Sequence, residues 1–354
     1  MSRRVTTMLA VCFGILCLAP AAQARLPKRF FGIAPQTVLG LKDTARMARG
    51  GVDSVRVPAP WSVLEPARGS HDWSSLDHVV GVAARKRLLV LPFLYSTPSW
   101  VAGRYTTLPV RSARQRQAWA GFLRSLVGRY GPRGSYWQSH PKLPKVPIRR
   151  WQIWNEENYF YFATPVTPGR YAALVKQSHR ALRQADRGAQ VLLGGLFSHP
   201  KPRAPRGMPA TRFLDRFYRV RGIRRAFEGV AVHPYAPTIG ALKTDLAEVR
   251  QVMRRHGDGG SGLYVTEFGW GSQAHSRVSF EVGRRGQARI LRRAYSYMRH
   301  AHRRLNLKQA FWFSWKDVRG TCNFCDSVGL FRAGHGLHAK PSWHAFTRAS
   351  GGRP

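Results

Sequence analysis

Residues 150–196 read RWQIWNEENYFYFATPVTPGRYAALVKQSHRALRQADRGAQVLLGGL and contain one full unit of the pattern that decides the fold. The apolar run at 150–154 is short enough for a buried strand, and residues 191–196 form a second such run. Between them, residues 169–185 carry apolar side chains at three- and four-residue intervals, which predicts a helix. A strand, a helix and a strand in this order predict two parallel strands joined by a crossover helix.

The same alternation continues in both directions along the chain. Further strands are predicted at residues 30–33, 54–57, 88–93, 229–233, 263–267 and 310–315. Further helices are predicted at residues 113–130, 242–256 and 286–301, with a short one near 341–347. Eight strands with intervening helices, and no visible linker, predict an α/β protein with a single (β/α)8 TIM barrel over residues 25–354.

The first residues have the pattern of a secretory signal peptide. Arg3 and Arg4 precede an apolar run at residues 8–18, and Ala22-Gln23-Ala24 has the small-x-small spacing of a cleavage site. We therefore assign residues 1–24 to a signal peptide and expect a secreted protein, with an uncleaved anchor as the alternative. The apolar run is too short for a spanning helix, so no stable membrane insertion is expected.

Two cysteines lie late in the chain, in the segment CNFCDSVGLFRAGHGLH. In an exported protein we expect Cys322 and Cys325 to close a small disulfide loop. His335 and His338 give the segment a superficial likeness to a zinc site, but a second CxxC is missing. No phosphate-binding glycine loop or dinucleotide fingerprint is present, and no metal or other cofactor is expected.

Charge is the most unusual feature of the composition. The 354 residues include 58 Lys and Arg but only 17 Asp and Glu, which gives a formal net charge of +41. The arginines are spread along the whole chain, and two explanations stay open: compositional bias, or attraction to an acidic polysaccharide or an anionic cell wall. Export and the lack of a binding motif argue against nucleic acid as the partner.

Two of the few carboxylates directly follow predicted strands. Glu156 follows the run at 150–154, and Glu267 stands at the end of the predicted strand 263–267, in the segment LYVTEFGW. Because the carboxyl ends of barrel strands meet at one face, both side chains are expected at the mouth of the barrel. Hydrolysis of a glycosidic bond needs two such carboxyl groups, one protonated and one ionised. An ion pair with one of the many arginines is the structural alternative for either glutamate.

Four motifs in this order resemble the clan A glycoside hydrolases: WNEEN at the fourth strand, HPY at the sixth, TEFGW at the seventh and FSW at the eighth. Within that clan the sequence is most similar to family 39 and its bacterial relatives that cleave exopolysaccharides. The segments VRVPAPWSVLEP and RYGPRGSYW agree with this resemblance, which extends over nearly all of residues 30–346. The resemblance implies a (β/α)8 barrel and a retaining mechanism without a cofactor.

The resemblance also implies a role for individual residues. Glu156 matches the acid/base and Glu267 the nucleophile of the clan. Asn155 matches the residue that binds the sugar 2-hydroxyl, and Trp315 matches the aromatic platform beneath the sugar. Tyr235 and Arg56 match the residues that support the nucleophile, and His233 lines the same subsite. Core packing is the alternative for Trp315, and a structural role is the alternative for His233 and Tyr235.

The sequence departs from the clan at one position next to the acid/base, and it has several aromatic residues near the predicted site. The clan usually has proline after the acid/base, where this chain has Glu157, which we expect to point elsewhere or to contact substrate. The aromatic side chains expected to extend the groove are Trp100, Tyr105, Tyr159 and Tyr161, whereas Trp137 is expected on the opposite face.

The resemblance leaves more than one function open. We expect a monomer that cleaves a poly- or oligosaccharide. A transglycosylase with the same two carboxylates, and a catalytically silent barrel that binds carbohydrate or cell wall, are the alternatives.

Overall fold

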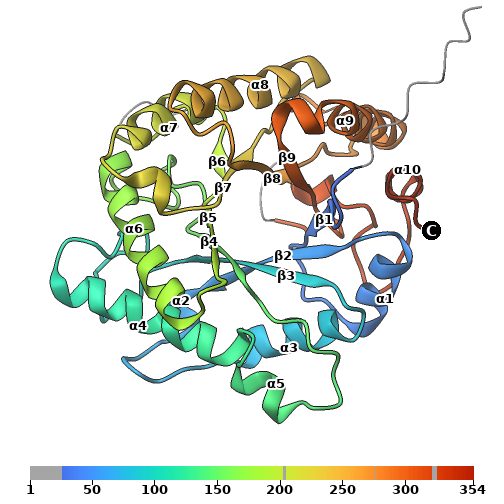
Figure 1. Cartoon of the computed structure of the whole chain (residues 1–354). Coiled ribbons are helices and arrows are strands. Elements are labelled where there is room, and N and C mark those ends of the chain that lie inside the picture. Colours follow the sequence, from blue (N-terminus) through green and yellow to red (C-terminus); the bar gives the residue numbers. More distant parts are fainter. Residues whose placement is uncertain (1–25, 202–204, 275, 321–324) are drawn as a thin grey trace, which may run out of the picture.

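A computed structural model describes residues 26–201, 205–274, 276–320 and 325–354. Nine parallel strands form one sheet, and their hydrogen bonds join the first strand to the last (Figure 1). The strands are β1 (Phe31–Ala34), β2 (Ser54–Pro60), β3 (Leu89–Tyr95), β4 (Arg150–Ile153), β5 (Gln190–Leu193), β6 (Leu196–Phe197), β7 (Gly229–His233), β8 (Gly262–Phe268) and β9 (Leu307–Phe313). The prediction of a (β/α)8 barrel is therefore confirmed.

The ninth strand arises because one predicted strand is interrupted. The run at 191–196 forms β5 and β6, which are separated by Gly194 and Gly195 and both pair with β7. β5 and β6 thus act together as the fifth strand of an eight-stranded barrel. The other predicted strands lie within a few residues of the observed ones, and β9 ends earlier than expected.

Helices surround the barrel on the outside (Figure 1). They are α1 (Leu41–Arg49), α2 (Trp61–Leu64), α3 (Ser74–Ala84), α4 (Ala113–Tyr130), α5 (Ser135–Ser139), α6 (Pro168–Ala185), α7 (Ala210–Tyr218), α8 (Ile239–Arg255), α9 (Gly283–Leu305) and α10 (Pro341–Ser350), with 3₁₀ turns η1 (Ile223–Arg225) and η2 (Cys325–Ser327). The prediction for α4 is confirmed at both ends, and α6, α8 and α9 begin one to three residues before the predicted positions.

Alternating side chains of the strands fill two separate apolar layers. The inner cluster, within the barrel, consists of Ala34, Leu91, Leu192, Ala231, Tyr264 and Phe311. The other apolar side chains of the strands pack outward against the helices in a much larger cluster. Because both faces of each strand are covered, the strands read as nearly continuous apolar runs, and polar side chains at their ends stand out.

Two expectations concern residues that the structure does not describe. The predicted signal peptide at 1–24 and Cys322 both lie outside the described residues, so the signal peptide and the disulfide stay predictions. Cys325 itself is buried in η2. Among the described residues, no helix has the length and apolar character needed to cross a bilayer.

Candidate active site

The chain after β4 holds Glu156 at the barrel mouth through an unusual backbone. Trp154 has φ of +74° and Glu156 has φ of +41°, a region that non-glycine residues seldom occupy. Trp154 is completely buried, and its indole N–H donates to the carbonyl of Phe162 at 2.6 Å. The backbone N–H of Glu156 donates to the carbonyl of Gly194 at 3.2 Å. These contacts fix a strained turn from which the Glu156 side chain projects, as often occurs at functional sites.

Glu267 lies near the end of β8 and is held by two donors, one on β2 and one just after β7. Arg56 of β2 donates from Nη1 to one carboxylate oxygen at 2.5 Å, and the Tyr235 hydroxyl donates to the other at 2.6 Å. Only 12% of the Glu267 side chain is exposed. Both carboxylate oxygens are therefore oriented before any substrate binds.

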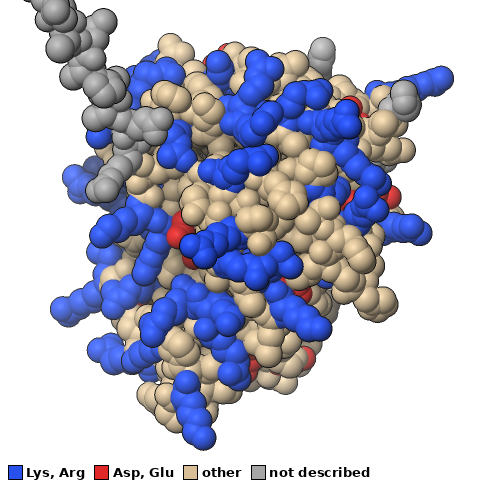
Figure 2. All heavy atoms as spheres, turned by 90° about the vertical axis from the view of Figure 1, so that its right-hand side faces the viewer, with Lys and Arg blue, Asp and Glu red and all other residues tan. Residues whose placement is uncertain are grey.

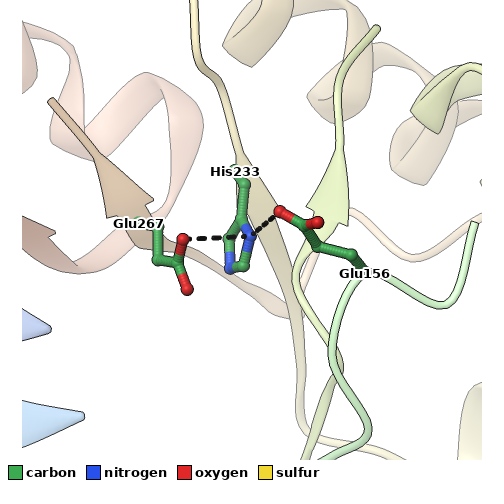
Figure 3. A group of neighbouring side chains, drawn as sticks. All are labelled: Glu156, His233 and Glu267. Atoms are coloured by element: carbon green, nitrogen blue, oxygen red, sulfur yellow. Dashed lines mark hydrogen bonds and ion pairs between the residues drawn. The ribbon is translucent and has the colours of Figure 1, made fainter. Parts of the chain in front are cut away.

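His233, the last residue of β7, lies between the two carboxylates (Figure 3). Its Nδ1 is 2.9 Å from an oxygen of Glu156 and 3.7 Å from an oxygen of Glu267. The nearest carboxylate oxygens of Glu156 and Glu267 are within 4.8 Å of each other. The three side chains come from β7, β8 and the turn after β4, so the barrel brings together residues more than a hundred positions apart.

The surroundings shift the pKa values of the two carboxyls in opposite directions. Burial raises the pKa of Glu156, and the nearby charge of Glu267 adds to this, against the lowering effect of His233. Burial would also raise the pKa of Glu267, but His233, Arg56 and Tyr235 together outweigh it and hold that pKa below its usual value. One carboxyl is thus biased to stay protonated while its neighbour is ionised, which is how acid and base roles are separated.

Arg56 is almost completely buried and uses all three of its guanidinium nitrogens. Besides Glu267, it donates to the side-chain oxygens of Asn155 and Gln152, each at 2.6 Å. Its guanidinium carbon also lies 4.0 Å from the centre of the Phe93 ring. Because its amide oxygen accepts from Arg56, Asn155 is left with its amide N–H groups to offer to a ligand.

A directional hydrogen-bond chain continues from Gln152 to Glu156. Gln152 donates to the Thr266 hydroxyl at 3.2 Å, and Thr266 lies 3.0 Å from Nε2 of His233. When the Thr266 hydroxyl accepts from Gln152 and donates to Nε2, the imidazole proton is placed on Nδ1. Nδ1 then donates to Glu156 at 2.9 Å. Gln152 and Thr266 were not predicted, because the strand runs that contain them indicated only a buried core.

The two glycines between β5 and β6 make room for side chains on both sides of the sheet. A Cβ atom at Gly194 would lie 2.2 Å from Glu157, and one at Gly195, where φ is +85°, would lie 2.2 Å from Nε2 of His233. Glu157 is completely buried, and neither of its carboxyl oxygens has a partner of hydrogen-bond geometry among the described residues. Burial raises the pKa of Glu157 to about 8. Glu157 is therefore packed in the interior beside Gly194, and its carboxyl favours the protonated form at pH 7.

The expectation for Trp315 was wrong. The β9 strand ends at Phe313, and Trp315 beyond it is completely buried, with its indole N–H donating to Asp43 at 2.8 Å. Its ring packs against Phe331 and Trp343 and offers no face to a sugar. The half-buried Phe313 instead lies beside the site, with its ring edge to face against Tyr235 at 6.0 Å.

Other aromatic side chains fall into two groups. Tyr159 packs against Phe197 at the end of β6, with ring centres 5.6 Å apart, and Tyr161 is exposed. These two, with the exposed Tyr105 and the half-buried Trp100, remain candidates for contacts with a longer ligand. Trp137 is buried, and its N–H donates to a backbone carbonyl of α4.

Two further aromatic side chains, Phe93 and Tyr95 of β3, were missed by sequence reasoning. Both are half-buried and stack on each other, with ring centres 5.2 Å apart, and Phe93 also contacts Arg56. Their two-residue spacing on one strand is the signal that could have shown them on the same side as Arg56.

Glu156, His233 and Glu267 also present three ligand atoms close enough together to contact one metal ion. Both nitrogens of His233 already have hydrogen-bond partners, and the guanidinium of Arg56 is bonded to Glu267. A divalent cation here would be repelled by the buried charge of Arg56. The donor set therefore suits proton transfer better than metal binding.

Comparisons with known proteins agree with this barrel. The model of a glycoside hydrolase family described as β-galactosidase (family 42) matches residues 37–127. A search of curated proteins found no match. A family 39 glycoside hydrolase from the gut symbiont Bacteroides cellulosilyticus WH2 is 19% identical, with a TM-score of 0.66 over 92% of this chain and 64% of that one. The present chain thus spans less than two thirds of that protein.

Two further solved structures share the fold. A monomeric β-xylosidase from Caulobacter crescentus CB15 is 17% identical, with a TM-score of 0.67 over 92% of this chain and 69% of that one. The exo-β-1,4-mannosidase Op5Man5 from Opitutaceae bacterium strain TAV5 is 15% identical, with a TM-score of 0.64 over 94% and 61%. The chain therefore has the (β/α)8 barrel of family 39 glycoside hydrolases and their relatives, as the resemblance of its motifs predicted.

Proposed function

We propose that this protein is a retaining glycosidase in which Glu156 is the acid/base and Glu267 the nucleophile. The observation that carries the proposal is the carboxyl pair itself: the two lie within 4.8 Å of each other, with pKa values displaced in opposite directions. A separation near 5 Å is typical of retaining enzymes, whereas inverting enzymes leave room for a water at roughly 6.5–9.5 Å.

In the first step, the ionised Glu267 attacks the anomeric carbon of the bound sugar. Glu156 gives its proton to the glycosidic oxygen as the bond to that oxygen breaks, and a covalent glycosyl ester forms on Glu267. The two donors to Glu267 hold it at a fixed angle, so little reorganisation is needed during attack. The Tyr235 hydroxyl remains a donor because burial and then Glu267 raise its pKa well above the usual value.

In the second step, Glu156 acts as a base. It removes a proton from a water molecule, which attacks the anomeric carbon and releases the sugar from Glu267 with its original configuration. The hydrogen bond from Nδ1 of His233 engages one oxygen of Glu156 and leaves the other for proton exchange. The free amide N–H groups of Asn155 are placed to donate to the sugar 2-hydroxyl, a contact that strengthens in the transition state.

The substrate class we propose is a polysaccharide or oligosaccharide with acidic groups. The net charge of +41 would concentrate an anionic glycan around the protein. The related structures are named for xylose, mannose and glucose chemistry, so they do not select one sugar. We propose that the protein acts as a monomer, as the structurally similar β-xylosidase from Caulobacter crescentus is described.

The test is to trap the glycosyl ester with a panel of 2-deoxy-2-fluoro glycosides that includes neutral sugars and uronic acids. These analogues slow the second step, so we expect an intact-mass gain of one sugar residue. Glu267→Gln should abolish the gain, because the nucleophile is lost while the shape of the side chain is kept. Glu156→Gln should still be labelled by an analogue with a good leaving group, which needs no acid.

Two outcomes would overturn the assignment. Labelling that persists in Glu267→Gln would place the nucleophile elsewhere, and a product of inverted configuration would exclude the covalent route. With labelling established, adding an acceptor sugar to the reaction separates a hydrolase from a transglycosylase. Failure of every analogue, together with retained binding of glycans, would favour the silent binding barrel.

A further inference from the structure

Helix α9 carries an unusual density of one charge. Its 23 residues include eight arginines and two histidines but no aspartate or glutamate. The arginines are Arg284, Arg285, Arg289, Arg292, Arg293, Arg299, Arg303 and Arg304. The first turn has no acidic side chain, although that is where a helix best tolerates one.

Six of the seven exposed arginines of α9 lie on one face, and Arg284 projects from another. At 3.6 residues per turn, positions 285, 289, 292 and 303 fall along one line, and Arg293 and Arg304 flank it. All six of these side chains are exposed, whereas Leu291, Ala294, Tyr295, Met298 and Ala301 are buried against the rest of the protein. The line from 285 to 303 is about 27 Å long at 1.5 Å per residue. We call these six residues the α9 stripe.

The stripe has no compensating charge. Among the described residues, none of its six arginines forms an ion pair with a carboxylate. Figure 2 shows the side of the molecule that lies to the right in Figure 1, where Lys and Arg are abundant and acidic side chains are few. Neighbouring arginines four positions apart repel each other, so the stripe is an unfavourable arrangement for the helix alone.

Helix α4 shows that composition alone does not produce such a stripe. It also lacks acidic residues, but its four arginines point in different directions around the helix: Arg114, Arg116, Arg124 and Arg129. Arg116 donates to a backbone carbonyl, and Arg129 is paired with Asp77. Two of the four scattered arginines on α4 thus have partners within the protein, whereas none of the six aligned arginines on α9 has a carboxylate partner among the described residues.

A groove between α8 and α9 adjoins the stripe. It has a volume of about 510 Å³ and is lined by Lys243 of α8 and by Arg292, Arg293, His300 and the Tyr297 ring of α9. The Lys243 ammonium lies 5.2 Å from the centre of that ring. Cationic side chains around a single half-buried aromatic ring form a site for a sugar that carries a negative charge.

We propose that the α9 stripe and the α8–α9 groove bind a linear acidic polysaccharide outside the catalytic mouth. An anionic chain laid along the helix contacts successive arginines and releases their counterions, which supplies most of the affinity. Sites for single-stranded nucleic acid combine a basic groove with several aromatic rings on which successive bases stack, and Tyr297 is the one aromatic ring among the described residues that line this groove. This favours a carboxylated glycan over RNA.

The position of α9 relates this site to the catalytic one. In a (β/α)8 barrel, each helix begins at the face where the strands end, so the first turn of α9 and the mouth lie on the same face. Residues 285–289 therefore mark the end of the stripe that is nearer to Glu267. A polymer held along α9 would be retained close to the mouth while its free segments reach the carboxyl pair. The inference extends the proposed function but does not depend on it, because binding alone tests it.

The experiment measures equilibrium binding of the full-length mature protein to polygalacturonate, neutral dextran and polyuridylate at several salt concentrations. The test variant is Arg289→Gln with Arg292→Gln and Arg293→Gln. We expect it to bind polygalacturonate at least about tenfold more weakly, with a slope of log K against log salt smaller by about 2 for three lost contacts. The wild type should not bind dextran.

A matched control removes the same charge elsewhere: Arg114→Gln, Arg180→Gln and Arg187→Gln, exposed arginines on and after α4 and α6. We expect less than a twofold change in the binding constant of this control, and a melting temperature that falls in neither triple variant. Equal losses in the two variants would show that net charge alone acts, and tighter binding of polyuridylate than of polygalacturonate would exclude the glycan; either result overturns the proposal. Labelling of Glu267 in the test variant, measured separately, shows whether the catalytic assignment stands.

Discussion

Arg56 and the arginines of the α9 stripe place the same side chain in opposite surroundings. Arg56 is 1% exposed and donates to three acceptors, with an aromatic ring beside its guanidinium. The stripe arginines are exposed and have no carboxylate partner among the described residues. Burial lowers the pKa of Arg56, and Glu267 opposes that effect, whereas water solvates the α9 charges directly.

The comparison shows which positions of this protein make a charged side chain costly in free energy. Removing a guanidinium from water costs several kcal/mol, and only a full set of hydrogen bonds and a counter-charge offsets it. Such a residue is fixed in one orientation and can serve chemistry that needs fixed geometry. An exposed guanidinium keeps its hydration, changes the free energy of unfolding by about 1 kcal/mol at most, and stays free to contact a mobile polymer.

The largest effect on activity is expected for Arg56→Lys, which keeps the positive charge but removes the planar guanidinium group with its several N–H donors. One ammonium cannot reach Glu267, Asn155 and Gln152 together, so the nucleophile loses orientation and two buried acceptors lose their donor. We expect kcat/KM to fall by about 10²–10³-fold on an activated glycoside. Arg289→Lys on the stripe is the matched control and should leave kcat/KM unchanged.

The pH profile sharpens this comparison. Arg56 helps to hold the pKa of Glu267 low, so weakening the contact should shift the acidic limb of the kcat/KM profile to higher pH. An activity loss without any shift of that limb would mean that Arg56 acts only by packing. Equal losses in Arg56→Lys and Arg289→Lys would remove the distinction between the two kinds of arginine.

An intermediate effect on stability is expected for Glu157→Gln, because Glu157 is buried like Arg56 but forms no ion pair with any described residue. Burial raises the pKa of its carboxyl to about 8 in the folded state, whereas the same carboxyl in the unfolded chain has a pKa near 4.5. Between these values the folded state binds more protons, so the free energy of unfolding falls by up to about 1.4 kcal/mol per pH unit as the pH rises. Glutamine does not titrate, so the Glu157→Gln variant lacks this contribution to the pH dependence.

Urea unfolding at pH 5 and pH 7.5 checks this prediction. The wild type should lose about 2–3 kcal/mol relative to Glu157→Gln over that interval. The exposed Glu248→Gln is the control and should follow the wild type. A pH dependence that is the same in wild type and Glu157→Gln would show that Glu157 is ionised and solvated in the folded protein.

Much of the fold followed from the sequence because the barrel depends on local periodicity. The strand-ending positions of Glu156 and Glu267 could be predicted for the same reason, since a carboxylate directly after an apolar run stands out in a chain with few acidic residues. Their closeness across the mouth depends only on the order of strands in a closed barrel. The motifs around them then indicated Arg56, Tyr235 and His233.

The remaining features depend on three-dimensional packing that periodicity does not contain. The apolar run at 310–315 predicted that Trp315 continues the strand, but the chain leaves the sheet after Phe313 and turns the indole into the core. The hydrogen-bond chain through Gln152 and Thr266 joins strands far apart in sequence, so neither residue had a recognisable partner beforehand. The break between β5 and β6 depends on space for Glu157 and His233, which only the folded structure reveals.

The smallest effect is expected for single charges of the stripe, and it should change sign along the helix. Arg285 lies near the N-terminus of α9, where the helix dipole disfavours a cation and where Arg289 adds repulsion from four positions away. Arg285→Gln should therefore raise the free energy of unfolding by about 0.3–1 kcal/mol at low salt. Arg304 lies in the last turn, where the helix dipole favours a cation, so Arg304→Gln should lower the free energy of unfolding by a similar amount.

Thermal unfolding at low and high salt distinguishes this from packing. Both changes should shrink as salt is added, because exposed charges more than about 10 Å apart are screened at 0.1 M. A salt-independent loss of stability in Arg285→Gln would mean that the aliphatic stem of Arg285 supports the helix. Packing would then explain the presence of Arg285 without a ligand. A gain in stability would mean instead that the stripe is kept at a cost to the fold, which is the condition under which selection for binding a polyanion explains it.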